Sequence, residues 1–450
     1  MPQVVRDVVK EGLATRLAAW KVLRRVHATG AWSTPALDTV LRRSRLDTRD
    51  RAFAANLAYS TLRWEGTLDW ALSVVLSRPL DQVQDDLVDV LRLGAWQLLF
   101  GGVPDRAAVG ITVELAREAV GPQSTGFTNG VLRALGRRLD TLPWPSVDDD
   151  EGLGLATGYP AWVAAAARQR VGPQRARLLL EAGNDSPGVT LRAVGERDAL
   201  VEELRVAGVD AVAGDWAAAA VRAPGADPGR LDAVAAGRAT PQDEASMLVV
   251  EALAAALGAD LAGARVLDAA AAPGGKSTHL ATLGAAVVAA DLRPARAQRV
   301  AQAAAHLGVA VDVVAADAGR PPWRADSFDA VLLDAPCSGL GVVRRRPELR
   351  WRRTPADVAE LAALQLRLLT RSVELVRPGG VLVFSVCTWT LEETVAVVQQ
   401  LLAAEGDRVA VEATAAPEGA DRLAGDPGVL LLPDRLDTDG FYVATFRRTG

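Results

Sequence analysis

Residues 266–276, VLDAAAAPGGK, contain the local pattern from which the fold of this 450-residue chain can be worked out. A short apolar strand ends in Asp268, small residues lead to a Pro-Gly-Gly turn at 273–275, and a helix is predicted to begin with Lys276 in its first turn. Small residues between a strand and a helix let a ligand lie against the backbone, and the N–H groups that open the helix favour a negatively charged group. The stretch therefore predicts a loop that holds a nucleotide-like cofactor.

Two other phosphate-binding motifs do not fit this loop. A P-loop needs glycine at the position of Ala270, and the G-x-G-x-x-G fingerprint of dinucleotide-binding folds is absent. The remaining interpretation is an adenosyl-cofactor loop of the Pro-Gly-Gly kind. Taken alone, the loop is also compatible with a plain tight turn followed by a helix start.

Strands and helices alternate after residue 264, which predicts a parallel, doubly wound α/β sheet. The acids Asp268, Asp291, Asp317 and Asp334 each follow a predicted strand, and ligands of such sheets bind beyond the carboxyl ends of the strands. Asp291 suits the hydroxyls of a ribose, and Asp317 suits the exocyclic amine of adenine. The predicted strands are 266–269, 286–290, 311–315, 330–333 and 381–386, and the predicted helices between them are 277–283, 294–307, 355–376 and 391–403.

Both cysteines of the chain follow predicted strands, Cys337 in the segment 334–339 and Cys387 after the strand at 381–386. They are therefore expected to share a pocket with the cofactor loop. Simple apolar packing and a disulfide are the alternatives, and a reducing compartment argues against the second. A thiolate beside a methyl donor indicates covalent activation of an electron-poor ring: its addition to carbon-6 of cytosine lets carbon-5 take the methyl group. A second thiol can then assist release.

The rest of the chain predicts a multidomain protein with a local RNA contact. The expected parts are an all-α domain at 1–139, a linker at 140–158, a small α/β subdomain at 159–245 and the α/β catalytic domain at 246–450. A net charge of −5 argues against a protein that coats nucleic acid over its whole surface. No signal peptide, membrane-spanning run or metal-ligand spacing is found, so we expect a cytoplasmic protein that binds neither membrane nor metal.

Two arginine-rich stretches are candidates for the RNA contact, and a solvated charged face is the alternative for both. Residues 41–51 carry five arginines against two aspartates. Residues 344–353, RRRPELRWRR, carry six arginines against one glutamate and follow Cys337, which predicts a place at the rim of the pocket. The predicted RNA-binding residues are Arg344, Arg345, Arg346, Arg350 and Trp351.

Two parts of the chain resemble known families. The N-terminal part resembles the NusB-like RNA-binding domain in Asp-Thr-Arg-Asp-Arg at 47–51, Pro-Asp-Arg-Ala-Ala-Val at 104–109 and the segment 126–133. Residues 240–450 resemble the RNA cytosine-C5 methyltransferase family, including the bacterial enzymes that act on 16S ribosomal RNA. The motifs are the stretch from Asp268 to Lys276, Asp-Ala-Pro-Cys-Ser-Gly at 334–339, and Cys387-Thr388 followed by Glu392-Glu393.

The resemblance implies S-adenosyl-L-methionine as methyl donor in a Rossmann-like domain, Cys387 as nucleophile, and Cys337 as the residue that aids release of the methylated RNA. Asp334 would hold the cytosine edge, and Lys276 would reach toward the substrate and the cofactor. Three positions depart from the family pattern, namely Ala270, Val386 and Thr394. The implied cofactor-binding residues are Asp268, Ala271, Ala272, Pro273, Gly274, Gly275, Lys276, Asp291, Arg296, Asp317 and Asp334.

The expected partner is RNA, either 16S ribosomal RNA or an assembling small subunit, and the expected state is a monomer. Three alternatives remain open. Cys337 could be the nucleophile, as the Pro-Cys cysteine is in DNA cytosine methyltransferases. The substrate could be another RNA, such as tRNA. The chain could also be a non-catalytic RNA-binding factor of the NusB kind.

Overall fold

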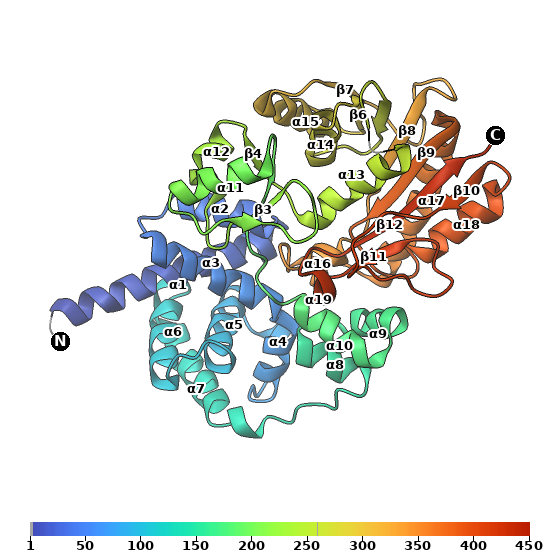
Figure 1. Ribbon diagram of the computed structural model, residues 1–450. Helices are drawn as coiled ribbons and strands as arrows, with labels where there is room; N and C mark the ends of the chain where they lie inside the picture. Colours follow the sequence, from blue (N-terminus) through green and yellow to red (C-terminus); the bar gives the residue numbers. More distant parts are fainter. Residues whose placement is uncertain (1–2, 259) are drawn as a thin grey trace. The chain divides into compact units, whose positions relative to one another are not determined.

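The computed structural model describes residues 3–258 and 260–450. Residues 1 and 2, where the predicted helical domain starts, and residue 259 lie outside the described part. The chain divides into two compact units (Figure 1). Unit 1 comprises residues 1–184 together with 345–352, and unit 2 comprises residues 185–344 together with 353–450. Residues 345–352 of the arginine-rich stretch therefore belong to the first unit, although they follow the catalytic segment in sequence.

Unit 1 is built from helices, which confirms the all-α prediction. Its core holds fully buried leucines such as Leu57, Leu91 and Leu132. Asp47 caps α3 by accepting a hydrogen bond from the backbone N–H of Asp50 at 2.8 Å. The helices are α1 (Gln3–Thr29), α2 (Ser33–Arg42), α3 (Thr48–Arg63), α4 (Glu65–Ser73), α5 (Asp85–Leu99), α6 (Asp105–Ala119), α7 (Thr125–Gly136), α8 (Asp150–Thr157), α9 (Ala161–Val171), α10 (Pro173–Ala182) and α16 (Leu349–Arg352).

The predicted linker at 140–158 is wrong for residues 150–157, which form α8. Asp149 caps this helix by accepting from the backbone N–H of Gly152 at 2.6 Å. The acids at 148–151 thus include a helix start, where carboxylates are favoured. Helix α8 packs against α9, and α9 and α10 cluster with unit 1 rather than with the small α/β subdomain that was expected to include them.

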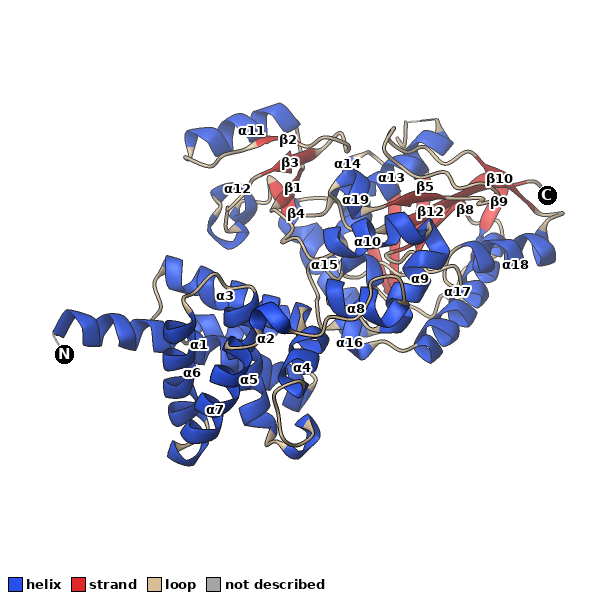
Figure 2. Cartoon of the chain, turned by 90° about the horizontal axis from the view of Figure 1, so that it is seen from below, coloured by secondary structure: helices blue, strands red, loops and turns tan. Residues whose placement is uncertain are grey.

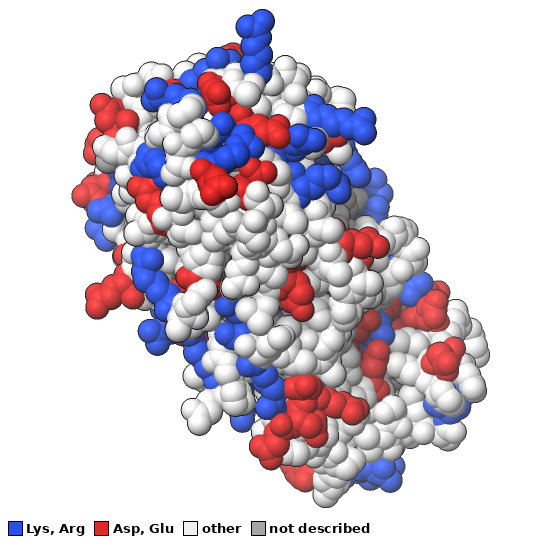
Figure 3. Space-filling model, turned by 90° about the vertical axis from the view of Figure 1, so that its right-hand side faces the viewer, with Lys and Arg blue, Asp and Glu red and all other residues white. Residues whose placement is uncertain are grey.

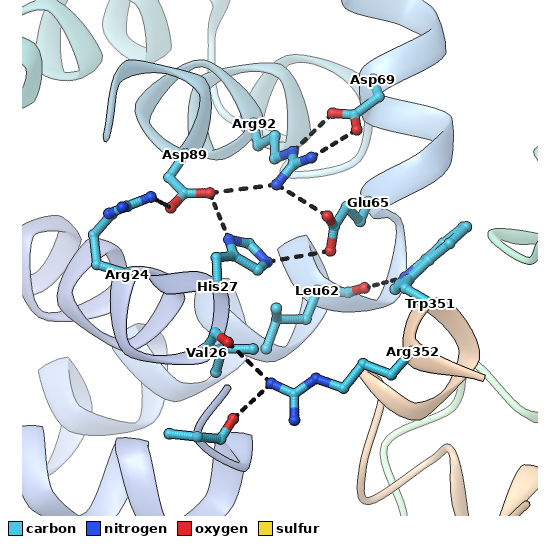
Figure 4. Close-up of polar contacts among 11 residues, drawn as sticks. Arg24, Val26, His27, Leu62, Glu65, Asp69, Asp89, Arg92, Trp351 and Arg352 are labelled. Atoms are coloured by element: carbon cyan, nitrogen blue, oxygen red, sulfur yellow. Dashed lines mark hydrogen bonds and ion pairs between the residues drawn. The ribbon is translucent and has the colours of Figure 1, made fainter. Parts of the chain in front are cut away.

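A half-buried ionic cluster joins α1, α4 and α5 within unit 1 (Figure 4). His27 Nδ1 lies 2.7 Å from Asp89 Oδ1, and His27 Nε2 lies 3.3 Å from Glu65 Oε2. Arg92 makes a bidentate pair with Asp69, with both N···O distances 2.7 Å. Burial lowers the pKa of His27, but hydrogen bonds to Asp89 and Glu65 outweigh burial and raise it to about 9. The cluster therefore holds His27 as a cation at neutral pH.

Unit 2 contains a small antiparallel sheet in strand order β2-β3-β1-β4 among the described residues. Its own apolar core includes Leu191, Leu204 and Val221. Figure 2 shows this sheet with α11 and α12 beside it. The elements are β1 (Thr190–Ala193), α11 (Arg197–Val206), β2 (Val212–Ala213), β3 (Ala220–Arg222), α12 (Asp232–Ala235) and β4 (Ala239–Pro241).

The larger sheet of unit 2 has eight strands in the described part of the chain, with the order β10-β12-β9-β8-β5-β6-β7 and β11 paired to β12. Helix α15 packs on β6 and β7, and α17 packs on β8 and β9. The strands are β5 (Arg265–Asp268), β6 (Ala286–Asp291), β7 (Val311–Ala315), β8 (Phe328–Asp334), β9 (Val376–Val386), β10 (Val409–Glu412), β11 (Val429–Leu431) and β12 (Phe441–Arg448). The helices are α13 (Glu244–Leu257), α14 (Gly275–Thr282), α15 (Pro294–Leu307), α17 (Pro355–Leu375), α18 (Val395–Glu405) and α19 (Pro433–Leu436).

The prediction of a parallel sheet is confirmed for the five predicted strands, which are β5 to β9, and three further strands that were not predicted extend the sheet. Strands β5, β6, β7, β8 and β9 pair in parallel. Strand β12 is antiparallel to β9, β10 and β11. The sheet is therefore mixed, as is common when an α/β sheet carries antiparallel strands at one edge. Within residues 3–258 and 260–450, no helix is long and apolar enough to cross a membrane.

Candidate active site

The cofactor loop lies between β5 and α14, where the sequence predicted it. Gly274 begins α14 with a φ of 110°, and a Cβ at this position would come within 3.1 Å of the Cα of Val300. Glycine is required there because both the backbone conformation and the space exclude a side chain. Ala271 donates its backbone N–H to the carbonyl of Ala290 at 2.8 Å, which fixes the loop to β6. The backbone beside the helix start is therefore held in place.

Asp268 is the buried acid of this loop. It is 1% exposed, and its Oδ2 accepts a hydrogen bond from Ser277 Oγ at 2.6 Å. Its Oδ1 is buried without a hydrogen-bond partner in the structure. Burial raises the pKa of Asp268 to about 6. An unsatisfied carboxylate oxygen at the start of a helix fits a ligand that supplies a donor, such as an ammonium group.

Two further acids follow the next strands. Asp291 pairs with Arg296, with 3.2 Å between its Oδ2 and the Nε of the arginine, and Arg296 also donates to the carbonyl of Ala272 at 3.3 Å. Asp317 is exposed, and its Oδ1 accepts from the backbone N–H of Gly319 at 2.8 Å. Arg296, predicted to contact the cofactor, thus links the first loop to the acid of β6. All three side chains lie at the predicted edge of the sheet.

An ion pair joins the cofactor loop to the end of β8. Lys276 Nζ lies 2.7 Å from Asp334 Oδ2, and 4.9 Å from the centre of the Phe441 ring. Burial lowers the pKa of Lys276, whereas the charge and the hydrogen bond of Asp334 raise it by a larger amount. The net shift of the pKa is upward, so the amine stays protonated. Ser385 donates to the other oxygen of Asp334 at 2.8 Å. Sequence reasoning did not single out Ser385, although the alternation along β9 places its side chain beside the acid.

The two thiols lie at the ends of the adjacent parallel strands β8 and β9. Cys337 Sγ and Cys387 Sγ are 3.2 Å apart, and both cysteines are free. The hydrogen bond to Cys387 and burial together raise the pKa of Cys337 well above its ordinary value. Cys337 is therefore a neutral thiol at neutral pH. Cys387 is one of the groups beside Lys276 that raise the pKa of that amine.

The prediction that Arg350 and Trp351 bind RNA at the pocket rim is wrong. Arg350 is 0% exposed, and its guanidinium lies 3.8 Å from the centre of the Tyr159 ring. Trp351 donates its indole N–H to the carbonyl of Leu62 at 2.7 Å. Arg352 donates to the carbonyl of Val26 at 3.0 Å (Figure 4). All three side chains donate to backbone carbonyls inside unit 1, and the fully buried guanidinium of Arg350 is not available to a phosphate.

Arg344, at the other end of the same stretch, is also unavailable for a surface contact. It is 4% exposed, and it pairs with Asp437 at 2.6 Å and donates to the carbonyl of Thr438 at 3.3 Å, both within unit 2. Arg345 is half-buried and Arg346 is exposed, so these two remain predictions. Among the described residues, no group of His, Cys, Asp and Glu could hold a metal ion.

Comparison with known proteins agrees with this architecture. Residues 257–447 match the family described as 16S rRNA methyltransferase RsmB/F, and residues 13–137 match the NusB family. A Mycobacterium tuberculosis protein described as a methyltransferase is 38% identical over 448 residues, 96% of each chain. The ribosomal RNA small subunit methyltransferase B of Pseudomonas syringae pv. tomato is 33% identical over 442 residues, which cover 95% of this chain and 96% of that protein. A solved methyltransferase homologue from Pyrococcus horikoshii has a TM-score of 0.57 and 27% identity over 68% of this chain and 99% of that chain.

The fold and the site together define an S-adenosylmethionine-dependent RNA methyltransferase with an N-terminal NusB domain. Matches that cover nearly the whole chain also show the family to which the protein belongs. The chain belongs to the RsmB/F methyltransferase family.

Proposed function

We propose that this protein methylates carbon-5 of a cytosine in small-subunit ribosomal RNA through a covalent adduct with Cys387. The observation that carries the proposal is the 3.2 Å separation of two thiols, Cys337 and Cys387, at the same sheet edge as the Lys276–Asp334 pair. The choice of RNA follows from relatives that are named ribosomal RNA small subunit methyltransferase B. RNA bases are most accessible in loops, so we expect a cytosine that leaves its stack to reach the thiols.

In the proposed reaction, Cys387 attacks the ring, Cys337 assists release, and Lys276 and Asp334 orient the ring. The thiolate of Cys387 adds to carbon-6, which forms an S–C bond and pushes the ring electrons toward carbon-5. S-adenosylmethionine supplies the electrophilic methyl group that carbon-5 takes. A water molecule then takes the carbon-5 proton, the 5,6 double bond re-forms, and the electron pair of the S–C bond returns to Cys387 as that bond breaks. Cys337, next to the leaving sulfur, assists this release. Lys276 and Asp334, held 2.7 Å apart, would orient the ring edge.

The chain's own residues fit S-adenosylmethionine. Asp268 offers an unsatisfied carboxylate oxygen to the ammonium group of the cofactor. Asp291 and Asp317 follow the next two strands, where a ribose and an adenine amine would lie in a sheet of this kind. The Pro-Gly-Gly turn brings bare backbone to the same edge.

A groove in unit 1 supports an RNA contact by the NusB domain. The groove has a volume of about 810 Å³ and an apolar floor that includes Leu17 and Val40. Its rim carries the exposed cations Lys21, Arg25, Arg43 and Arg45. Acidic and basic side chains are interspersed over the face drawn in Figure 3. The net charge of −5 likewise favours a local RNA contact, such as this rim would allow.

The test is covalent trapping on an RNA that contains 5-fluorocytosine, where loss of the carbon-5 proton is blocked. Cys387→Ala should abolish the adduct, and Cys337→Ala should retain it. An adduct that persists in Cys387→Ala and disappears in Cys337→Ala would assign the attack to Cys337, the arrangement of DNA cytosine methyltransferases. Failure of the wild type to transfer labelled methyl to any ribosomal RNA or tRNA would favour a non-catalytic RNA-binding factor.

A further inference from the structure

Glu393 is a fully buried carboxylate beside the two thiols, and the reaction steps above do not use it. Its Oε1 accepts hydrogen bonds from the backbone N–H of Ser338 at 2.7 Å and from Gln365 Nε2 at 3.0 Å. Its Oε2 accepts from the hydroxyl of Ser338 and from Thr390 Oγ1, the latter at 3.2 Å. Glu393 therefore connects the loop after β8, helix α17 and the loop after β9.

All four partners of Glu393 are donors. An ionised carboxylate is the side-chain group that accepts at both oxygens and donates at neither, so its chemistry matches this set of partners. A glutamine would place an N–H group against one pair of donors. Burial makes the match more important, because a donor left unsatisfied away from water is costly.

The hydrogen bonds of Glu393 act directly on the residue that follows Cys337, and through it on the residue that follows Cys387. Ser338 follows Cys337, and Thr388 follows Cys387, and their hydroxyl oxygens lie 2.9 Å apart. Because the hydroxyl hydrogen of Ser338 is donated to Glu393, the hydroxyl of Thr388 must donate to Ser338. A chain of hydrogen bonds thus runs from the Cys387 loop through the Cys337 loop to the buried carboxylate.

Other contacts restrain the same two loops. Gln365 also donates to the carbonyl of Pro336 at 2.9 Å, and the backbone N–H of Gly341 donates to the carbonyl of Cys387 at 3.0 Å. Neither contact joins the residue after one cysteine to the residue after the other. The Glu393–Ser338–Thr388 chain is the link that does so.

We propose that Glu393 is a positioning residue that sets the distance between the two sulfur atoms, and through that distance the rates of attack and release. The catalytic meaning of this spacing rests on the proposed function, in which both thiols take part. The spacing itself can be measured without RNA.

The first experiment uses phenylarsine oxide on the full-length protein. The arsenical condenses with two neighbouring thiols: two S–H bonds break, two S–As bonds form and one water is released. The chain has two cysteines, so bridging reports on Cys337 and Cys387 alone. We expect tight one-to-one binding to the wild type and binding at least about tenfold weaker to Glu393→Ala. The matched control is Glu392→Ala, which removes an exposed carboxylate from the same segment and should bind like the wild type.

The second experiment measures methyl transfer. Glu393→Ala should lower kcat about 10²-fold, because a displacement of reacting groups by about 1 Å has effects of that size. The KM values for RNA and S-adenosylmethionine should stay unchanged, since Glu393 contacts neither in the proposed arrangement. Glu393→Gln should restore part of kcat and part of the arsenical affinity, because one of its oxygen positions still accepts.

If Glu393→Ala does not fold, as judged by circular dichroism and cofactor affinity, Ser338→Ala and Glu393→Gln take its place. Ser338→Ala removes the hydroxyl link and should weaken arsenical binding to a smaller extent. The proposal is overturned if the folded variants bind the arsenical and turn over like the wild type. It stands, while the proposed function fails, if Glu393 variants lose arsenical binding but the wild type transfers no methyl group to RNA.

Discussion

Arg350→Met is the substitution that tests most directly whether the arginine-rich segment is structural. In unit 1, Arg350 donates to the carbonyl of Gly158 at 3.0 Å, to Asn184 Oδ1 at 2.8 Å and to the carbonyl of Gly183 at 3.1 Å. Each hydrogen bond to a charged group contributes about 1.5–3 kcal/mol when its partner is lost. Removing the buried charge recovers several kcal/mol of its desolvation cost, so the net loss of unfolding free energy should be about 2–4 kcal/mol.

Urea unfolding followed by tryptophan fluorescence measures this change. Eight of the eleven tryptophans lie in unit 1 (positions 20, 32, 64, 70, 96, 144, 162 and 351), so the signal reports mainly on this unit. A loss of this size should lower the urea midpoint by about 1 M. The matched control is Arg346→Met, an exposed arginine of the same segment, which should change stability by less than about 1 kcal/mol.

An unchanged urea midpoint for Arg350→Met would refute the structural role of this arginine. If the variant instead kept full stability but bound RNA more weakly, with a smaller salt dependence, the segment would be an RNA-binding surface after all. The two outcomes separate cleanly, because a guanidinium held inside unit 1 affects stability, whereas one that contacts phosphate affects affinity.

Three further predictions follow from the charges in the structure. Because the pKa of His27 is raised to about 9, its ion pairs should stabilise unit 1 by about 3 kcal/mol below pH 6.5, and this stabilisation should be lost as pH rises through 9. In His27→Gln, the free energy of unfolding measured with urea should depend less on pH. Because the pKa of Asp268 is about 6, calorimetry should show S-adenosylmethionine affinity rising with pH through 6, and Asp268→Asn should remove that dependence. The double variant Arg43→Gln/Arg45→Gln should bind RNA more weakly in fluorescence anisotropy. The slope of log K against log salt concentration should fall by about 0.7 per lost phosphate contact. Methyl transfer to a short RNA is the control.

The elements of the catalytic sheet could be predicted well where the pattern is local. Helix α15 (Pro294–Leu307) and strand β7 (Val311–Ala315) have the predicted bounds, since proline, glycine and apolar spacing mark their ends. The antiparallel direction of β12 could not be predicted in this way. The direction of a strand depends on which partner it meets, and β12 pairs with β9 more than 50 residues earlier in the chain.

In the candidate site, residues at strand ends could be predicted from the sequence, whereas contacts between distant residues could not. Asp268, Lys276, Asp334 and both cysteines could be found in sequence because parallel strands bring their carboxyl ends to one edge. The hydrogen bonds between Glu393 and Ser338 could not be predicted, because these residues are 55 positions apart in the chain. The sequence around Glu393 does not indicate which residue its carboxylate contacts. The role of Arg350 was predicted wrongly for a related reason, since a charged stretch has the same composition whether it faces solvent or carbonyl groups.

Local patterns in the sequence were enough to predict the order of the elements, the cofactor loop and the candidate reacting groups, because these depend on backbone preferences and on side-chain chemistry within a few residues. The distance between the two sulfurs, the contacts of Glu393 and the packing of residues 345–352 became known only from the folded chain. Those properties arise from burial, which brings distant residues together and requires every polar group removed from water to find a partner.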